Sequence, residues 1–380
     1  MNFACFVHSA VSDWNHGNAH FLRGLLSALA AHGHTVTAWE PRLPWSARNL
    51  VKEHGFAPVV EFARAYPEIG VRSYDPADEE LLERLEDATR TANVVLVHEW
   101  NSPRLVGALG HLRRRGAGWT LLFHDTHHRP WSDPAAIARF NLSAYDGVLA
   151  FGEVLRRIYL ERFGTHRAWT LHEAADTRRF RPLERPESDD VVWIGNWGDA
   201  ERSVELERFW LAAARAHPEL RWAAYGVRYP GEAVEALAKA GVDYRGWAAS
   251  LEVPEIFARS RVTLHIPRQA YVEGLAGIPT IRVFEALACG IPLVSAPWFD
   301  AEDLFRPGDY AVGETPAELR SEILRLLGDR EAAAEQAARG LESVLARHTC
   351  DHRAGELLDI VAELGTCDSS APPERVAAWS

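Results

Sequence analysis

The sequence predicts an α/β protein of two doubly wound domains that face each other across a cleft. Short β-rich runs alternate with helical patterns along the whole chain, which is typical of parallel sheets covered by helices. The chain has 380 residues, more than one hydrophobic core usually serves. A Pro- and charge-rich break at residues 181–190 divides it near the middle, so we expect one domain on each side of this linker.

The first half alternates strands with helices. We expect strands at residues 2–8, 34–40, 93–98, 119–124, 147–152 and 168–172, and helices at residues 17–33, 103–115 and 153–164. The first helix is the clearest, because Leu22, Leu25 and Leu29 repeat at the spacing of one helix face. This pattern predicts a first domain over residues 1–183.

The second half repeats the alternation with different residues. We expect strands at residues 191–195, 221–226, 243–247, 261–266 and 291–297, and helices at residues 202–217, 232–241, 281–289, 316–328, 330–348 and 351–365. The pattern predicts a second domain over residues 184–350. A helix at about 351–365 is expected to pack back on the first domain, and residues 366–380 are expected to be a mobile tail.

Composition excludes several classes of function. The net charge of -12 makes a nucleic-acid partner unexpected. No run approaches the roughly 20 apolar residues of a membrane span, and the first residues lack the basic and apolar segments of a signal peptide. The four cysteines show no C-x-x-C spacing and indicate no disulfide framework. We therefore expect a globular cytoplasmic protein without a transmembrane segment.

The loop after the first strand gathers polar side chains. It contains Asp13, His16, Gly17 and Asn18 directly before a predicted helix. Backbone N–H groups at a helix start bind an anion or a sugar hydroxyl. An ordinary helix cap would explain Asn18 but not the whole cluster, so we predict that this loop lines a ligand site.

Two strands of the first half end in ionisable residues, His98 with Glu99 and His124 with Asp125. Because histidine titrates near neutrality, these side chains are candidates for a general base or for a pair that orients a substrate. The H-x-x-H-H pattern that begins at His124 matches no established metal spacing, and no cysteine lies nearby. We therefore expect no metal site.

A Gly-rich loop in the second half precedes a short apolar helix that carries Glu285. Gly277 and Thr280 lie before the helix start, where free N–H groups suit a diphosphate. Glu285 lies one turn further on, and a carboxylate there can accept hydrogen bonds from both vicinal hydroxyls of a ribose. The plain alternative is that an acid near a helix N-terminus is electrostatically favourable.

Four segments of the chain resemble GT-B glycosyltransferases of the group 1 type, in particular their spore-maturation-protein-like branch. These segments are "HGNAHFLRGLLSALAAHGHTV", "LLFHDTHH", "AWTLHEAADTRRFRP" and "RVFEALACGIPLVSAP". The last is similar to the donor-site motif E-A-x-A-x-G-x-P and is the most specific. The resemblance implies two Rossmann-like domains that move a sugar from a nucleotide diphosphate sugar to an acceptor, without a metal or another cofactor.

The resemblance also implies roles for single residues in donor binding. It places Glu285 on the ribose of the donor. The usual Arg–Lys pair for the diphosphate is absent in familiar form, so its place is expected to be taken by arginines among Arg202, Arg268 and Arg282. Many members carry a second Glu seven residues before the one that matches Glu285, and this position is Ile278 here.

The first domain is expected to supply the acceptor or sugar side, with His16, Gly17, Asn18, His98 and Glu99. Two arrangements stay open at the reacting carbon. An inverting enzyme needs a base, for which Asp13 is placed. In a retaining enzyme His124, which matches a family histidine that contacts the donor sugar, would be essential, and Asp125 would set its tautomer or act as a base. We favour retention with His124.

Two other functions are compatible with these residues. One is a GT-B-fold sugar-nucleotide epimerase, which needs acid and base groups on both faces of the sugar and no acceptor. The other is a non-catalytic protein of the same fold that binds a sugar or a partner. The sequence names neither the sugar nor the acceptor.

Overall fold

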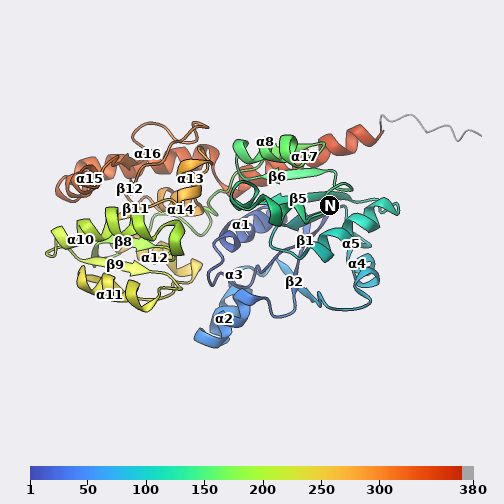
Figure 1. Cartoon of the computed structure of the whole chain (residues 1–380), viewed down its shortest axis with the longest axis horizontal. Coiled ribbons are helices and arrows are strands. Elements are labelled where there is room, and N and C mark those ends of the chain that lie inside the picture. Colours follow the sequence, from blue (N-terminus) through green and yellow to red (C-terminus); the bar gives the residue numbers. More distant parts are fainter. Residues whose placement is uncertain (370–380) are drawn as a thin grey trace, which may run out of the picture.

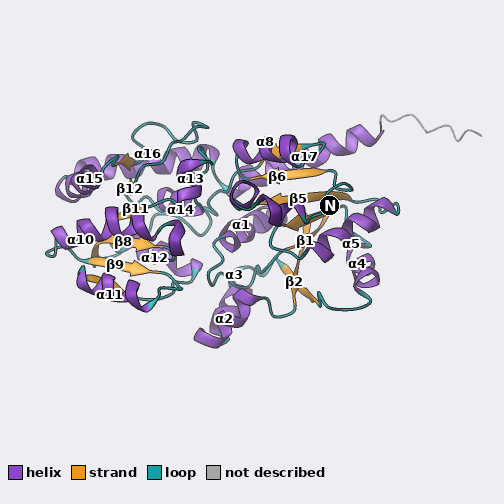
Figure 2. Ribbon diagram, viewed as in Figure 1, coloured by secondary structure: helices purple, strands orange, loops and turns teal. Residues whose placement is uncertain are grey.

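The computed structural model describes residues 1–369 and contains two parallel sheets, one in each half of the chain (Figure 1). The strand order is β3-β2-β1-β4-β5-β6-β7 in the first sheet and β10-β9-β8-β11-β12-β13 in the second. Helices cover both sheets (Figure 2). The predicted fold class, two α/β domains with parallel sheets, is confirmed.

The first domain surrounds the seven-stranded sheet. Its strands are β1 (Asn2–Phe6), β2 (Thr35–Pro41), β3 (Gly70–Tyr74), β4 (Val94–His98), β5 (Thr120–Asp125), β6 (Gly147–Ala150) and β7 (Ala168–Thr170). Its helices are α1 (Asn18–Ala31), α2 (Trp45–His54), α3 (Ala57–Ala65), α4 (Leu81–Thr89), α5 (Pro103–Arg114), α6 (Arg129–Ser132), α7 (Pro134–Ala138) and α8 (Glu153–Arg162). The elements between β2 and β4 were not expected from the sequence.

The second domain surrounds the six-stranded sheet. Its strands are β8 (Asp189–Ile194), β9 (Trp222–Tyr225), β10 (Val242–Tyr244), β11 (Ser260–His265), β12 (Leu293–Ser295) and β13 (Ala311–Val312). Its helices are α9 (Ser203–Glu205), α10 (Ala212–Ala216), α11 (Gly231–Lys239), α12 (Val253–Ala258), α13 (Gln269–Glu273), α14 (Ile281–Ala288), α15 (Pro316–Gly328) and α16 (Arg330–Arg347). Three further short helical segments are η1 (Asp199–Glu201), η2 (Leu206–Leu211) and η3 (Ser250–Glu252). The helix expected over 202–217 is therefore interrupted, because η2 is a π-helical segment between α9 and α10.

The central strands of each sheet are buried on both faces, as is usual in parallel sheets. Successive residues of β1 show this, because Cys5 packs in a core with α1 while Phe6 packs in a second core with α4 and α5. The six-stranded sheet likewise separates two cores. The expected boundary between residues 183 and 184 falls in the crossing from β7 to β8 and stays a prediction.

The C-terminal helix α17 (Cys350–Ser369) packs against α1 and contacts β5, beside the first domain (Figure 1). Cys350, Ala354 and Leu357 belong to the same core as the leucines of α1. A Cβ atom at Gly24 of α1 would overlap Cys350, so this glycine lets the two helices approach closely. Of the expected tail, residues 366–369 continue the helix, and 370–380 lie outside the described residues.

Between residues 1 and 369, no helix combines the length and the apolar character that crossing a bilayer requires.

A cleft between the domains as the candidate active site

A cleft of ≈ 720 Å³ lies between the two domains. Its walls come from the segments that follow β1 and β5 in the first domain and β8 and β11 in the second, together with the start of α14. These segments follow the carboxyl ends of parallel strands, where ligands of doubly wound folds bind. Sequence-predicted residues from both domains meet here, so the cleft is the candidate active site.

Two helix N-termini meet in this cleft. Helix α1 begins after Gly17 and α14 begins after Thr280, and neither residue makes a side-chain capping hydrogen bond. A Cβ atom placed on Gly17 would lie 3.9 Å from Cγ2 of Ile281, the first residue of α14. Each helix start carries a partial positive charge and N–H groups without helical partners. Their meeting point favours an anion.

The second domain adds arginines to this positive region. Arg202 is only 7% exposed and donates to the Asn196 backbone and side-chain oxygens at 2.6 and 2.5 Å. Its Nε has no hydrogen-bond partner among the described residues. Burial and the neighbouring Arg268 lower the pKa of Arg202 to about 9. A buried cation with an unused donor suits an anionic ligand.

Arg268 and Arg282 also line the cleft, each beside one carboxylate. Arg268 pairs with Glu201 and donates to the Asn196 side chain at 3.3 Å. Arg282 Nη1 lies 2.5 Å from Glu285 Oε2. The three arginines predicted for the diphosphate therefore come together at one cavity.

Glu285 connects the two domains. Its side chain is 1% exposed, its Oε1 lies 2.6 Å from His20 Nδ1 of α1, and its Oε2 pairs with Arg282. Glu285 is buried and does not itself line the cleft, so contact with a ribose requires the groups that cover it, His20 among them, to move. The ribose role of Glu285 stays a prediction.

Asp13 also bridges the domains. Its Oδ2 accepts from Arg23 Nη1 at 3.1 Å and from the Ser250 amide of the second domain at 2.7 Å. Burial raises its pKa, but Arg23, His20 and the Ser250 hydrogen bonds outweigh burial and hold the pKa below its usual value. Asp13 is therefore an ionised carboxylate held by donors, which makes it a weak base.

His16, Gly17 and Asn18 line the first-domain wall as predicted from their loop. His16 is buried with an Nε2 that has no partner among the described residues, and burial lowers its pKa well below the usual range. Asn18 Nδ2 donates to Thr126 Oγ1 at 2.5 Å. A neutral imidazole nitrogen is thus available to a ligand in the cleft.

The four ionisable residues at the ends of β4 and β5 lie beneath the cleft and do not line it. His98 and His124 are register partners whose rings lie 5.4 Å apart, and both nitrogens of His124 lack hydrogen-bond partners. His98 bonds Thr126 Oγ1 at 3.0 Å, so this cluster touches the cleft wall through Thr126. Contact of His124 with a donor sugar would require a rearrangement, and its catalytic role stays a prediction.

The buried carboxyl groups of this cluster titrate unusually. Burial raises the pKa of Glu99 to about 8. Burial and the nearby Glu99 raise the pKa of Asp125 to about 8, although Tyr159 donates to Asp125 at 2.5 Å. Burial lowers the pKa of His98 to about 3, so the cluster is neutral or nearly neutral at pH 7.

Gly277 lies outside the cleft wall. Its φ of +90° is accessible to glycine, and a Cβ atom there would overlap Glu302. Thr280, in contrast, lines the cleft at the start of α14. Of the two residues predicted from the Gly-rich loop, one therefore shapes the loop and the other faces the ligand space.

Sequence reasoning missed several residues of the cleft, among them Asn196, Glu201 and Glu173. Asn196 and Glu201 follow β8 in "WIGNWGDAE", a loop whose glycines could have suggested a close approach of backbone to ligand. Glu173 is on the crossing between the domains, where no motif marked it. Across residues 1–369, no group of three or more His, Cys, Asp or Glu side chains is arranged to hold a metal ion.

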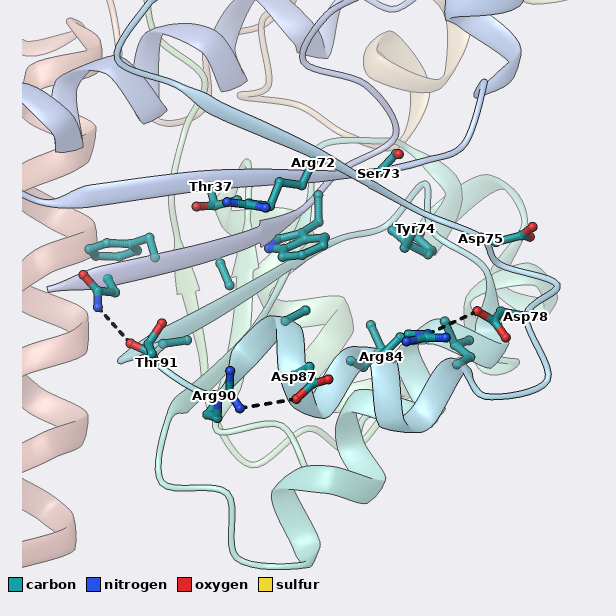
Figure 3. Close-up of a pocket in the computed structure, with 18 of the residues that line it drawn as sticks. Thr37, Arg72, Ser73, Tyr74, Asp75, Asp78, Arg84, Asp87, Arg90 and Thr91 are labelled. Carbon is teal, nitrogen blue, oxygen red and sulfur yellow. Dashed lines mark hydrogen bonds and ion pairs between the residues drawn. The ribbon is translucent and has the colours of Figure 1, made fainter.

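A larger hollow, here called the edge pocket, lies against β1, β2, β3 and α4 of the first domain (Figure 3). Its volume is ≈ 980 Å³. Figure 3 shows ion pairs from Arg84 to Asp78 and from Arg90 to Asp87, whose atoms lie 3.7 and 3.6 Å apart. None of the residues predicted for the active site lines this pocket.

Comparisons with known proteins agree with this architecture. Residues 202–359 match a family model described as glycosyl transferase-like. A comparison with curated proteins finds no match. Among solved structures, a sucrose-phosphate synthase from Thermosynechococcus elongatus is similar at 15% identity and a TM-score of 0.68, over 97% of this chain and 100% of that chain.

Two further structures are similar over nearly their whole length. An E. coli trehalose-6-phosphate protein bound with UDP-2-fluoro glucose shares 12% identity at a TM-score of 0.62, over 95% of this chain and 99% of that chain. Anabaena HepE in complex with UDP and glucose shares 13% identity at a TM-score of 0.65, over the same shares of the two chains, 95% and 99%. The chain as a whole therefore has the two-domain GT-B fold, and residues 202–359 are similar to the glycosyl transferase-like family.

Proposed function

We propose that the protein transfers a sugar from a nucleotide diphosphate sugar to an acceptor bound in the interdomain cleft. The observation that carries this proposal is the convergence of Arg202, Arg268 and two helix N-termini on one cavity. Such a site binds a diphosphate and stabilises the charge that develops on it as it leaves. Since two similar structures contain UDP ligands, UDP-sugars are the first donors to test.

The two domains take different parts in the proposed reaction. The second domain and the start of α14 hold the nucleotide, with Glu285 on the ribose once His20 moves aside. The first domain supplies the acceptor side through His16, Gly17 and Asn18, beside Trp45 and Trp100, which line the cleft and are each 40% exposed. Indole faces stack on the C–H faces of sugars, which suits a carbohydrate acceptor.

We propose a retaining course without a metal. The carboxylate placed to act as the base of an inverting reaction, Asp13, is held by Arg23 and Ser250. Arginines and helix N-termini take over the charge stabilisation that a metal would otherwise supply. His124 and Asp125 act from beneath the cleft, where the His98–Thr126 contact connects them to its wall. We also place the protein in the spore-maturation-protein-like branch and in the cytoplasm, where its buried free cysteines stay reduced.

Incubation of the full chain with UDP-sugars tests the proposal. Slow release of UDP, with water as a poor acceptor, is the expected result, and UDP should raise the melting temperature. A new sugar isomer would instead show an epimerase, and tight binding without turnover would show a non-catalytic binding protein. NMR of the product's anomeric carbon decides the stereochemical course, and an inverted product would overturn retention.

A further inference from the structure

Glu173 is a buried carboxyl group in a cavity that also gathers arginines and two helix N-termini. It lies on the crossing segment between β7 and β8, lines the cleft and is only 4% exposed. Its Oε1 is buried and has no hydrogen-bond partner among the described residues. An unpaired buried carboxyl oxygen is costly, so its presence in a ligand cavity requires an explanation.

The position of Glu173 is where the two helix N-termini meet. The backbone N–H of Ile281, the first residue of α14, lies close enough to the Glu173 carboxyl to lower its pKa. Ile281 also lies against Gly17 at the start of α1. Glu173 therefore lies at the point that would hold the diphosphate, and a negative charge on both groups would make them repel each other.

The charges around Glu173 come from several elements. Glu285 and Arg282 face it from α14, Glu99 from the end of β4, and Tyr271 from α13. Burial, Glu285 and Glu99 raise its pKa, and the Ile281 amide and Arg282 lower it by less, so that the pKa is about 8. The carboxyl is therefore protonated at pH 7 and becomes charged as the pH rises through about 8.

We propose that Glu173 is a further residue of the reaction, a neutral acid that donates a hydrogen bond to an oxygen of the donor's diphosphate. This inference rests on the proposed function. The proton stays on Glu173 throughout, so the contact stabilises the bound donor and its leaving group without proton transfer. When the carboxyl is charged, it has no proton to donate and it repels the diphosphate.

Ile278, the position where many group 1 members carry a second Glu, supplies no acid to the cleft. Ile278 is 1% exposed and packs closely against Gly152, so closely that a Cβ atom on this glycine would overlap it. The acidic group reaches the cleft from the interdomain crossing instead of from the loop before α14. A purely structural role is the competing explanation, in which Glu173 only caps α14 and its charge state is irrelevant to turnover.

Two substitutions separate these explanations. Glu173→Gln keeps a neutral donor of the same shape at every pH, whereas Glu173→Ala removes the donor. We expect the parent's kcat/KM with a UDP-sugar, and its affinity for UDP, to fall as the pH rises through about 8. Glu173→Gln should lose less than Glu173→Ala at neutral pH and should no longer show this fall. Glu99→Gln is a second check, because Glu99 does not line the cleft but helps to raise the pKa of Glu173. This variant should keep the fall and move it to lower pH.

The outcomes distinguish this inference from the function on which it rests. If the parent binds UDP and turns over, and the kcat/KM of Glu173→Gln falls with rising pH as the parent's does, the role of Glu173 is overturned. The proposed function would still stand. A Glu173→Ala variant whose kcat/KM equals the parent's, with only a lower melting temperature, also overturns it and leaves a structural cap. A parent that binds no nucleotide diphosphate overturns both the inference and the proposed function.

Discussion

The cleft and the edge pocket are both hollows with several arginines, yet their charges are arranged differently. In the edge pocket the charged partners are close in sequence and open to solvent. Arg84 and Asp78 are 62% and 32% exposed, and Arg90 and Asp87 are 76% and 71% exposed. Such exposed pairs contribute little and have little need of a ligand.

In the cleft the charged groups come from distant parts of the chain and are buried. Arg202 retains an unused Nε, His16 an unused Nε2 and Glu173 an unused Oε1. The edge pocket is the larger of the two hollows, so volume alone does not favour the cleft as the candidate site. Among the described residues that line the edge pocket, Trp39 alone has such an atom, its Nε1, so buried polar atoms without partners favour the cleft.

Replacing Arg202 with methionine should have the largest effect and tests this comparison directly. The substitution keeps an unbranched side chain and removes the guanidinium, which donates to Asn196 and lies 5.1 Å from the centre of the Trp193 ring. We expect the Kd for UDP to rise about 10- to 150-fold, the value of one charged hydrogen bond, with a weaker dependence on salt. Isothermal titration at two salt concentrations measures both quantities.

Arg84→Met in the edge pocket is the matched control. Its side chain is exposed and pairs with Asp78, so UDP affinity should stay at the parent's value. If Arg84→Met weakened UDP binding as much as Arg202→Met, the nucleotide would bind in the edge pocket and the comparison would fail.

Glu285→Ala should weaken UDP binding by about 1.5–3 kcal/mol if the carboxylate binds the ribose. His20→Ala removes the partner that occupies Glu285 Oε1, so under the same role it should leave UDP affinity intact or improve it. Equal losses in the two variants would show that the Glu285–His20 pair acts only as a clamp between the domains. Titration of both variants with UDP decides between the roles.

Asp125→Asn should change the pH dependence of stability rather than binding. The folded-state pKa of Asp125 is raised to about 8, so as the pH rises toward 8 the unfolded chain has released a proton that the folded chain still holds. This group therefore makes the parent lose stability as the pH rises. The quantity to follow is the melting temperature of Asp125→Asn minus that of the parent. We expect this difference to rise by a few degrees from about pH 5 to about pH 8.5. A constant difference across this range would contradict the raised pKa.

Thr37→Phe should have the smallest effect on function. Thr37 lies on β2 and lines the edge pocket, so a phenyl ring there fills part of the hollow (Figure 3). We expect UDP affinity and turnover equal to the parent's, measured in the same titration and release assays. Loss of turnover without loss of stability would give the edge pocket a role in the reaction.

Much of the fold could be predicted because its central strands carry a strong local signal. Strand β4 is apolar at every position before His98, and the leucines of α1 mark one face. Strand β3 carries no such signal, because four of its five residues are exposed at the edge of the sheet. Its pairing with β2 comes from tertiary context, which a local pattern does not contain.

The site was predictable to the level of strand ends but not of side-chain direction. The sequence places His124 at the end of β5, yet whether its ring enters the cleft depends on Phe21 and His98, which pack against it from other elements. One of the two partners of Glu285 is similarly distant, since His20 is 265 residues away. Glu173 was missed because its chemistry arises only where α1, α14 and the crossing segment meet.

The packing of α17 on α1 has a consequence for synthesis of the chain. The core beneath α1 includes Cys350, Ala354 and Leu357, so the first domain lacks part of its interior until these residues leave the ribosome. The six-stranded sheet ends at β13 and has its own two cores, so it can complete before α17 emerges. The domain made first is therefore finished last, and until then the apolar face of α1 stays open to chaperones.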